Sequence, residues 1–92
     1  MQEVTSQHEP FVSSAIAAVA SHLDEENFGV AELAEEMNMS RSTLLRRVKA
    51  ATGLSAAMFI RQQRLKHARS FLQEARFTVS EVAYKTGFSS SS

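Results

Sequence analysis

The hydrophobic positions near the start of this chain recur every three or four residues, which is the period of an amphipathic helix. The first such stripe comprises Val12, Ile16, Val19 and Leu23. Pro10 suits a first helical position, because its missing N–H is not needed there. The pattern therefore predicts a helix over about residues 10–23, preceded by a flexible polar tail over residues 1–9.

Capping residues divide the following segment into two shorter helices. A helix over residues 30–37 is predicted to end at Asn38, a residue that tolerates the left-handed conformation. Ser40 is a suitable N-cap for the next helix, over residues 41–52, and Gly53 suits its end. The two helices are thus separated by only a few residues.

Two more helices complete the prediction. Ser55 caps a long helix to about residue 75, which at ~1.5 Å per residue spans about 30 Å. Thr78 and Glu81 form a T-x-x-E capping box that opens a short helix to about residue 86. With three glycines, one proline and many good helix formers, the chain is predicted to be all-α.

An internal repeat links the second and fifth predicted helices. Residues 28–43 read FGVAELAEEMNMSRST and residues 77–92 read FTVSEVAYKTGFSSSS, with six of sixteen positions identical at an offset of 49 residues. The repeated unit is a helix, a tight turn and a capped second helix. Ala34, four residues before Asn38, is small enough for the two helices to cross closely. This is the pattern of a helix-turn-helix, which presents its second helix to a major groove of DNA.

Charge is divided unevenly along the chain, although the formal net charge is zero. Residues 1–39 hold eight acidic residues and no Lys or Arg, whereas residues 40–92 hold all ten basic residues and two acidic ones. Such an asymmetry suggests an anionic partner. Residues 37–73 contain no acid at all and eight bases, namely Arg41, Arg46, Arg47, Lys49, Arg61, Arg64, Lys66 and Arg69.

The helix over residues 41–52 has one apolar face and one face suited to contact DNA. Its core side is predicted to comprise Leu44, Val48 and Ala51. The opposite side carries Ser42, Leu45, Arg46 and Lys49, with Arg41 at the N-terminal end. Phosphates bind to cations and to helix N-terminal amides, and arginine can read guanine through two hydrogen bonds. A solvated surface remains the alternative for the bases after residue 60, and partial burial the alternative for Leu45.

The order and spacing of the motifs resemble a known family. S-R-S-x-L-x-R, T-G-L-S, F-I-R-x-x-R-L and V-A-Y-x-x-G-F-S follow one another as in the DNA-binding domain of AraC/XylS-type transcription regulators. The resemblance implies sequence-specific promoter binding by two helix-turn-helix subdomains joined by one long helix. It also implies base-reading roles for Ser42, Leu45 and Arg46. The expected contacts to the DNA backbone are Ser40, Arg41, Thr43, Arg47, Lys49 and Ser55.

The resemblance also predicts how the chain is organised. Residues 10–54 would form the first subdomain, residues 55–75 the linker helix and residues 76–92 the start of a second subdomain, truncated near the third residue of its recognition helix. An incomplete second subdomain would leave an apolar surface for a homodimeric or swapped contact. A separate sensing or signalling module is expected in the full-length protein.

Several other classes of protein are disfavoured. The chain has no cysteine, its three histidines lack metal-ligand spacing, and no phosphate loop, nucleophile motif or paired-carboxylate motif is present, so neither an enzyme nor a metal or cofactor is expected. No signal peptide or apolar run of ~18–20 residues occurs, which predicts a cytoplasmic protein without a membrane contact. The alternative function is an all-helical protein-interaction module whose acidic first half binds a basic partner. Salt-dependent DNA binding would distinguish the two.

Overall fold

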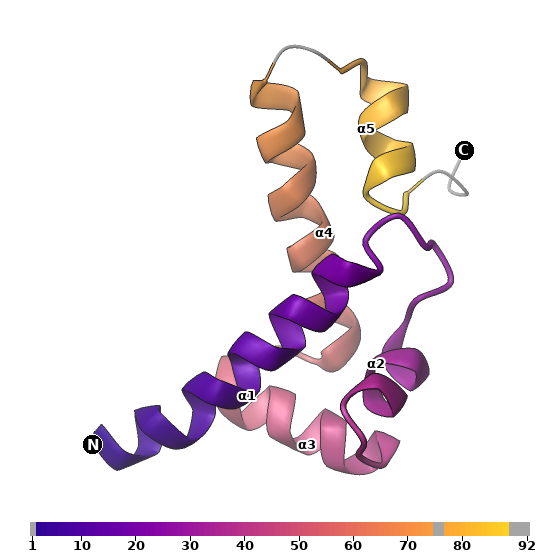
Figure 1. Ribbon diagram of the computed structural model, residues 1–92. Coiled ribbons are helices and arrows are strands. Elements are labelled where there is room, and N and C mark those ends of the chain that lie inside the picture. Colours follow the sequence, from indigo (N-terminus) through magenta and orange to yellow (C-terminus); the bar gives the residue numbers. More distant parts are fainter. Residues whose placement is uncertain (1, 75–76, 89–92) are drawn as a thin grey trace.

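The computed structural model describes residues 2–74 and 77–88, and every regular element in those residues is a helix (Figure 1). The helices are α1 (Gln2–Ser21), α2 (Val30–Glu36), α3 (Arg41–Thr52), α4 (Ala56–Gln73) and α5 (Val79–Lys85). The expected all-α fold is confirmed. Within these residues, no helix has the length and apolar character needed to cross a membrane.

The helices begin at the predicted capping residues in three cases. Ser55 Oγ accepts a hydrogen bond from the backbone N–H of Met58 at 3.1 Å, and Ser40 caps α3 in the same way. Thr78 and Glu81 form the expected reciprocal capping box, in which each side chain accepts from the backbone N–H of the other residue. Because each cap satisfies an N–H that the helix leaves free, these residues determine where the helices start.

The start of α1 differs from the prediction. The helix begins at Gln2, so Pro10 lies inside it and residues 2–9 are helical rather than a tail. A proline within a helix removes one backbone hydrogen bond and crowds the preceding turn, but it does not prevent helix formation on its N-terminal side. The buried stripe also differs, since Phe11, Ala15 and Val19 face the core while the predicted Val12 is only half-buried.

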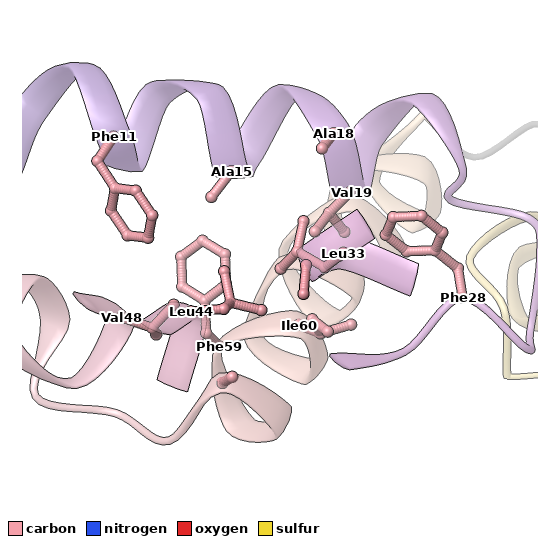
Figure 2. Close-up of a cluster of buried hydrophobic side chains, with 12 residues drawn as sticks. Phe11, Ala15, Ala18, Val19, Phe28, Leu33, Leu44, Val48, Phe59 and Ile60 are labelled. Atoms are coloured by element: carbon pink, nitrogen blue, oxygen red, sulfur yellow. The ribbon is translucent and has the colours of Figure 1, made fainter. Parts of the chain in front are cut away.

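One hydrophobic core lies between α1, α2, α3 and the start of α4 (Figure 2). Figure 2 shows the α1 side chains Phe11 and Val19 pointing toward the side chains of α3 and α4. The buried members of this core are Phe11, Ala15, Ala18, Val19, Phe28, Leu33, Ala34, Leu44, Val48, Ala56, Phe59 and Ile60. α2 and α3 are thereby held against α1 as one packed unit.

The sequence repeat is also a structural repeat as far as residue 88. Asn38 ends the turn after α2 with φ of 58°, and Gly87 occupies the matching place after α5 with φ of 84°. The next residue donates its N–H across each turn, from Met39 to the Ala34 carbonyl at 3.0 Å and from Phe88 to the Ala83 carbonyl at 2.7 Å. The serines that match Ser40 and Ser42, Ser89 and Ser91, lie outside the described residues.

α4 connects the packed unit to α5. Its first half contributes Ala56, Phe59 and Ile60 to the core. Its second half continues beyond the core, and α5 lies beside this half (Figure 1). α5 runs back along α4, so its C-terminal end approaches the α1–α2 connection, as Figure 1 shows. The end of the second helix-turn pair thus meets the first unit.

Candidate nucleic-acid interface

α3 presents one face to the core and the other to solvent. Leu44 and Val48 are 0% and 1% exposed, whereas Ser42, Arg46 and Lys49 are exposed. At about 100° per residue, these three exposed side chains share the face opposite Leu44 and Val48. The structure therefore gathers three of the predicted DNA-contacting residues on one surface of a firmly packed helix.

The turn between α2 and α3 determines the direction in which this surface points. Ala34 is 3% exposed at the point where the two helices approach, and its carbonyl accepts from Met39 across the turn. Asn38 adopts the left-handed backbone conformation, which is costly for most residues and least so for glycine and asparagine. A small residue and a left-handed residue at these positions allow the chain to reverse within a few residues.

The N-terminus of α3 is organised by its capping serine. Ser40 Oγ accepts the backbone N–H of Thr43 at 3.1 Å and donates to Thr43 Oγ1 at 2.9 Å. Ser42 Oγ lies 3.5 Å from Ser40 Oγ. The first backbone N–H groups of a helix have no partner inside the helix, and here they belong to Arg41 and Ser42. Exposed helix amides beside an arginine are suited to bind an oxygen anion.

Arg46 and Lys49 differ in how they are held. In residues 2–74 and 77–88, Arg46 is exposed and makes no hydrogen bond or ion pair. Lys49 donates through Nζ to the carbonyl of Gly53 at 3.1 Å, at the C-terminal end of α3. A cation at that end also interacts favourably with the helix dipole. Arg46 is therefore free to extend outward, while Lys49 is oriented along its own helix.

The remaining predicted contacts lie around this surface. The Arg47 guanidinium stands 4.4 Å from the centre of the Phe11 ring, which turns it toward α1. Leu45 is 41% exposed, on the flank of α3 between core and solvent. Ser55 lies beyond the end of α3, where its hydroxyl caps α4. The structure thus brings Arg41, Ser42, Arg46 and Lys49 together and places Arg47 and Ser55 at the margin.

Arg64 differs from the other seven bases of residues 37–73, which are exposed. Its side chain is 6% exposed, and its guanidinium donates to four backbone carbonyls, so it cannot form part of a solvated basic face. Burial lowers the pKa of Arg64 from its usual value. The sequence held a signal for this, because Arg64 lies four residues after Ile60 and seven before Phe71, in phase with the apolar face of α4.

The acidic half of the chain contains one histidine with defined partners. His22 Nδ1 lies 3.0 Å from Glu25 Oε2, His22 Nε2 lies 3.4 Å from Glu36 Oε1, and the imidazole stacks on Phe28 at 4.4 Å. The hydrogen bond that His22 donates to the Glu25 carboxylate is the main cause of the raised pKa of His22, with smaller contributions from the charges of Glu25 and Glu36. His22, in the connection between α1 and α2, thereby joins this connection to α2.

A further carboxylate in this half, that of Glu32, caps the start of α2. The Gly29 N–H donates to Glu32 Oε1 at 3.0 Å, and this bond lowers the pKa of the Glu32 carboxyl, with a minor contribution from the charge of Arg41.

No group of three metal-binding side chains occurs in the part of the chain that the structure describes.

The fold and the surface together define a helix-turn-helix domain, and comparison with known proteins agrees. The helix-turn-helix domain family matches residues 33–92. The chain belongs to the AraC-type helix-turn-helix family, the DNA-binding domain of transcription regulators. No solved structure matches the chain.

Its curated relatives are much longer proteins. The chain is 31% identical over 91 residues, 99% of its length, to the HTH-type transcriptional activator RhaS of Salmonella arizonae, of which it covers 32%. It is 37% identical over 59 residues to RhaS of Escherichia coli strain SE11, covering 64% of the chain and 21% of that protein. Histidine kinase P4 of Formosa agariphila is 31% identical over 87 residues, which are 95% of this chain and 6% of the kinase. The chain spans at most about a third of the length of these relatives.

Proposed function

We propose that this chain binds double-stranded DNA sequence-specifically, with α3 in the major groove. The observation that carries the proposal is the exposed face of α3 bearing Arg46, on a helix whose other face is fixed in the core through Leu44 and Val48. A recognition helix needs both properties, because base contacts require side chains held in a defined register on the DNA.

Base reading is assigned to Ser42, Leu45 and Arg46. Arg46 has the reach and the free donors to bind guanine O6 and N7 together, a contact worth ~1–3 kcal/mol of discrimination. Ser42, one turn earlier on the same face, can hydrogen-bond to a neighbouring base edge. Leu45, 41% exposed, offers apolar contact to a thymine methyl group.

Contacts to the DNA backbone are assigned to the residues around this face. Arg41 and the first amides of α3 would bind one phosphate, and the hydroxyls of Ser40 and Thr43 keep those amides in place. Lys49 would contact the backbone from the other end of α3. Arg47, on the side of α1, and Ser55, at the start of α4, would bind phosphates at the margin of the site.

The same proposal extends to a second DNA-binding unit, here called the second reader, which follows α4 in the chain. α5 and the turn at Gly87 repeat the conformation of α2 and the turn at Asn38, which supports a tandem arrangement of two helix-turn-helix units. Two readers joined by α4 would contact successive major grooves, since one turn of DNA is about 34 Å long.

We further propose that the domain serves a longer, cytoplasmic regulator without catalytic activity of its own. The RhaS relatives are named transcriptional activators and are several times longer, which supports a separate sensing or signalling module. A homodimeric contact through the second subdomain is supported by the exposed apolar side chains of α4 and α5, among them Leu72 at 45% and Val79 at 74%.

The deciding experiment selects duplexes from a random pool with this chain and then measures affinity at several salt concentrations. The expected result is an enriched motif together with a linear fall of log affinity with log salt. Equal recovery of all sequences would contradict a sequence-specific reader. Absence of any salt-dependent DNA binding would instead favour a protein-interaction module.

A further inference from the structure

One buried arginine connects two parts of the chain. From the middle of α4, Arg64 Nη1 donates to the carbonyls of Leu23 at 2.6 Å and Thr86 at 2.9 Å, and Nη2 donates to those of Glu25 and Phe28, each at 3.0 Å. The guanidinium is planar and rigid, so these four acceptors are held at fixed positions about one plane.

The four acceptors come from separate units. Leu23, Glu25 and Phe28 lie in the connection between α1 and α2, which belongs to the first helix-turn-helix unit. Thr86 ends α5, is 0% exposed, and begins the turn of the second repeat. A single side chain therefore joins the first unit to the element that would position the second reader.

The acceptors of this charged group in the described residues are backbone carbonyls. In residues 2–74 and 77–88 no carboxylate pairs with Arg64, so its burial depends on the carbonyls alone. Moving α5 away would leave a buried donor unsatisfied, which is costly. The bonds to the two units thus resist relative movement of α5.

Gly87 allows this close approach. A Cβ at Gly87 would overlap Arg64 Nη1 and lie 2.8 Å from the Leu23 carbonyl oxygen, and φ of 84° also disfavours a side chain. The Thr86 carbonyl can accept from Arg64 because the next residue, Gly87, has no side chain that would overlap the guanidinium.

We propose that Arg64 is a positioning residue for DNA reading, which fixes α5 and the second reader relative to α3. The inference rests on the proposed function for its role on DNA, whereas the fixed geometry belongs to the free protein. Two readers that must meet successive grooves need a defined separation. Arg64 supplies it through contacts that no other basic residue of α4 makes among the residues described.

The chain lacks cysteine, so spin labels can be placed on introduced cysteines without interference. A pair at Glu35 in α2 and Val79 in α5 reports the distance between the units, and a pair at Glu35 and Ala50 reports the first unit alone. Double electron–electron resonance on Arg64→Lys should give a distance distribution at least twofold broader for the first pair and unchanged for the second. Arg69→Lys, an exposed arginine of the same helix, is the matched control and should change neither pair.

Gly87→Ala disturbs the same contact from the side of α5. It should broaden the distance distribution of the Glu35–Val79 label pair, which provides a second test if Arg64→Lys does not fold. An unchanged inter-unit distribution in a folded variant would overturn the proposal, and so would equal broadening of both pairs, since that would mean a general loss of packing. Because no DNA is present, these results stand apart from the duplex selection. A chain that fails to select DNA can still have its units fixed by Arg64.

Discussion

Ser40 and Thr43 are joined by two hydrogen bonds at the start of α3. Thr43 donates its backbone N–H to Ser40 Oγ at 3.1 Å, and Ser40 Oγ donates to Thr43 Oγ1 at 2.9 Å. Both residues were expected to contact the DNA backbone directly. In the free chain their hydroxyls act on the helix itself, and the amides of Arg41 and Ser42 between them are left to face a phosphate.

The first prediction concerns this cap. Ser40→Ala removes the acceptor for Thr43 N–H and should lower the free energy of unfolding by about 1 kcal/mol, measured by urea denaturation. It should also weaken DNA binding, because the end of α3 that faces DNA would fray. Thr78→Ala, which removes the equivalent cap of α5, is the control. It should lower stability by a similar amount, and equal loss of DNA affinity in both variants would contradict a local role for Ser40.

Arg46 should determine sequence preference. Arg46→Ala removes an exposed guanidinium that has no hydrogen bond or ion pair within the described part of the chain, so the free energy of unfolding should change by less than about 0.5 kcal/mol. Repeating the duplex selection should show lost preference at one position, corresponding to ~1–3 kcal/mol. A variant that keeps the full motif but binds every duplex more weakly would assign Arg46 to a phosphate instead.

Lys49 should act on affinity rather than on preference. Lys49→Ala is expected to weaken binding to all duplexes alike and to reduce the slope of log affinity against log salt by about one. The control is Lys66→Ala, which removes an exposed lysine of α4 that is not among the assigned DNA contacts. The assignment fails if Lys66→Ala reduces the slope as much as Lys49→Ala does.

Two adjacent leucines of α3 should behave in opposite ways. Leu44 is 0% exposed and Leu45 is 41% exposed. Leu44→Ala should lower the free energy of unfolding by about 2–5 kcal/mol, since it leaves a cavity in the core. Leu45→Ala should lower it by less than about 1 kcal/mol and should change the selected DNA motif. Comparable destabilisation by the two substitutions would mean that the exposed face of α3 is wrongly assigned.

Local rules predicted most of this fold. The starts of α3, α4 and α5 follow from Ser40, Ser55 and Thr78, because an N-cap bond depends on residues three apart in sequence. The left-handed turn at Asn38 follows from the same kind of reasoning. The predicted start of α1 is wrong, because Pro10 suits the first turn of a helix but lies inside this one.

Longer-range relationships were beyond such rules. The sequence places Arg64 in a run of bases that are otherwise exposed, yet Arg64 is buried and its acceptors lie up to 41 residues away in sequence. The position of Arg64 on the apolar side of α4 indicates that its side chain is buried, but it does not identify the carbonyls that accept its hydrogen bonds. The surface residues of α3 could be predicted, because helical geometry alone separates Arg46 from Leu44, whereas the DNA roles of these residues depend on a partner that the chain does not contain.

The last prediction concerns pH. His22 lies against Glu25 and Glu36, which raise its pKa above the ordinary value of 6.5, so the folded chain binds the imidazole proton more tightly than the unfolded chain does. This contribution to stability is complete below pH 6.5 and is lost as the pH rises through the higher pKa of the folded state. Unfolding at a series of pH values should therefore show stability falling across this window. His22→Gln should remove that part of the fall, whereas His67→Gln in α4 should retain it. A wild-type chain whose stability rises from pH 6 to 8, or a His22→Gln variant with the same fall as wild type, would mean that the imidazole does not pair with Glu25 and Glu36 in solution.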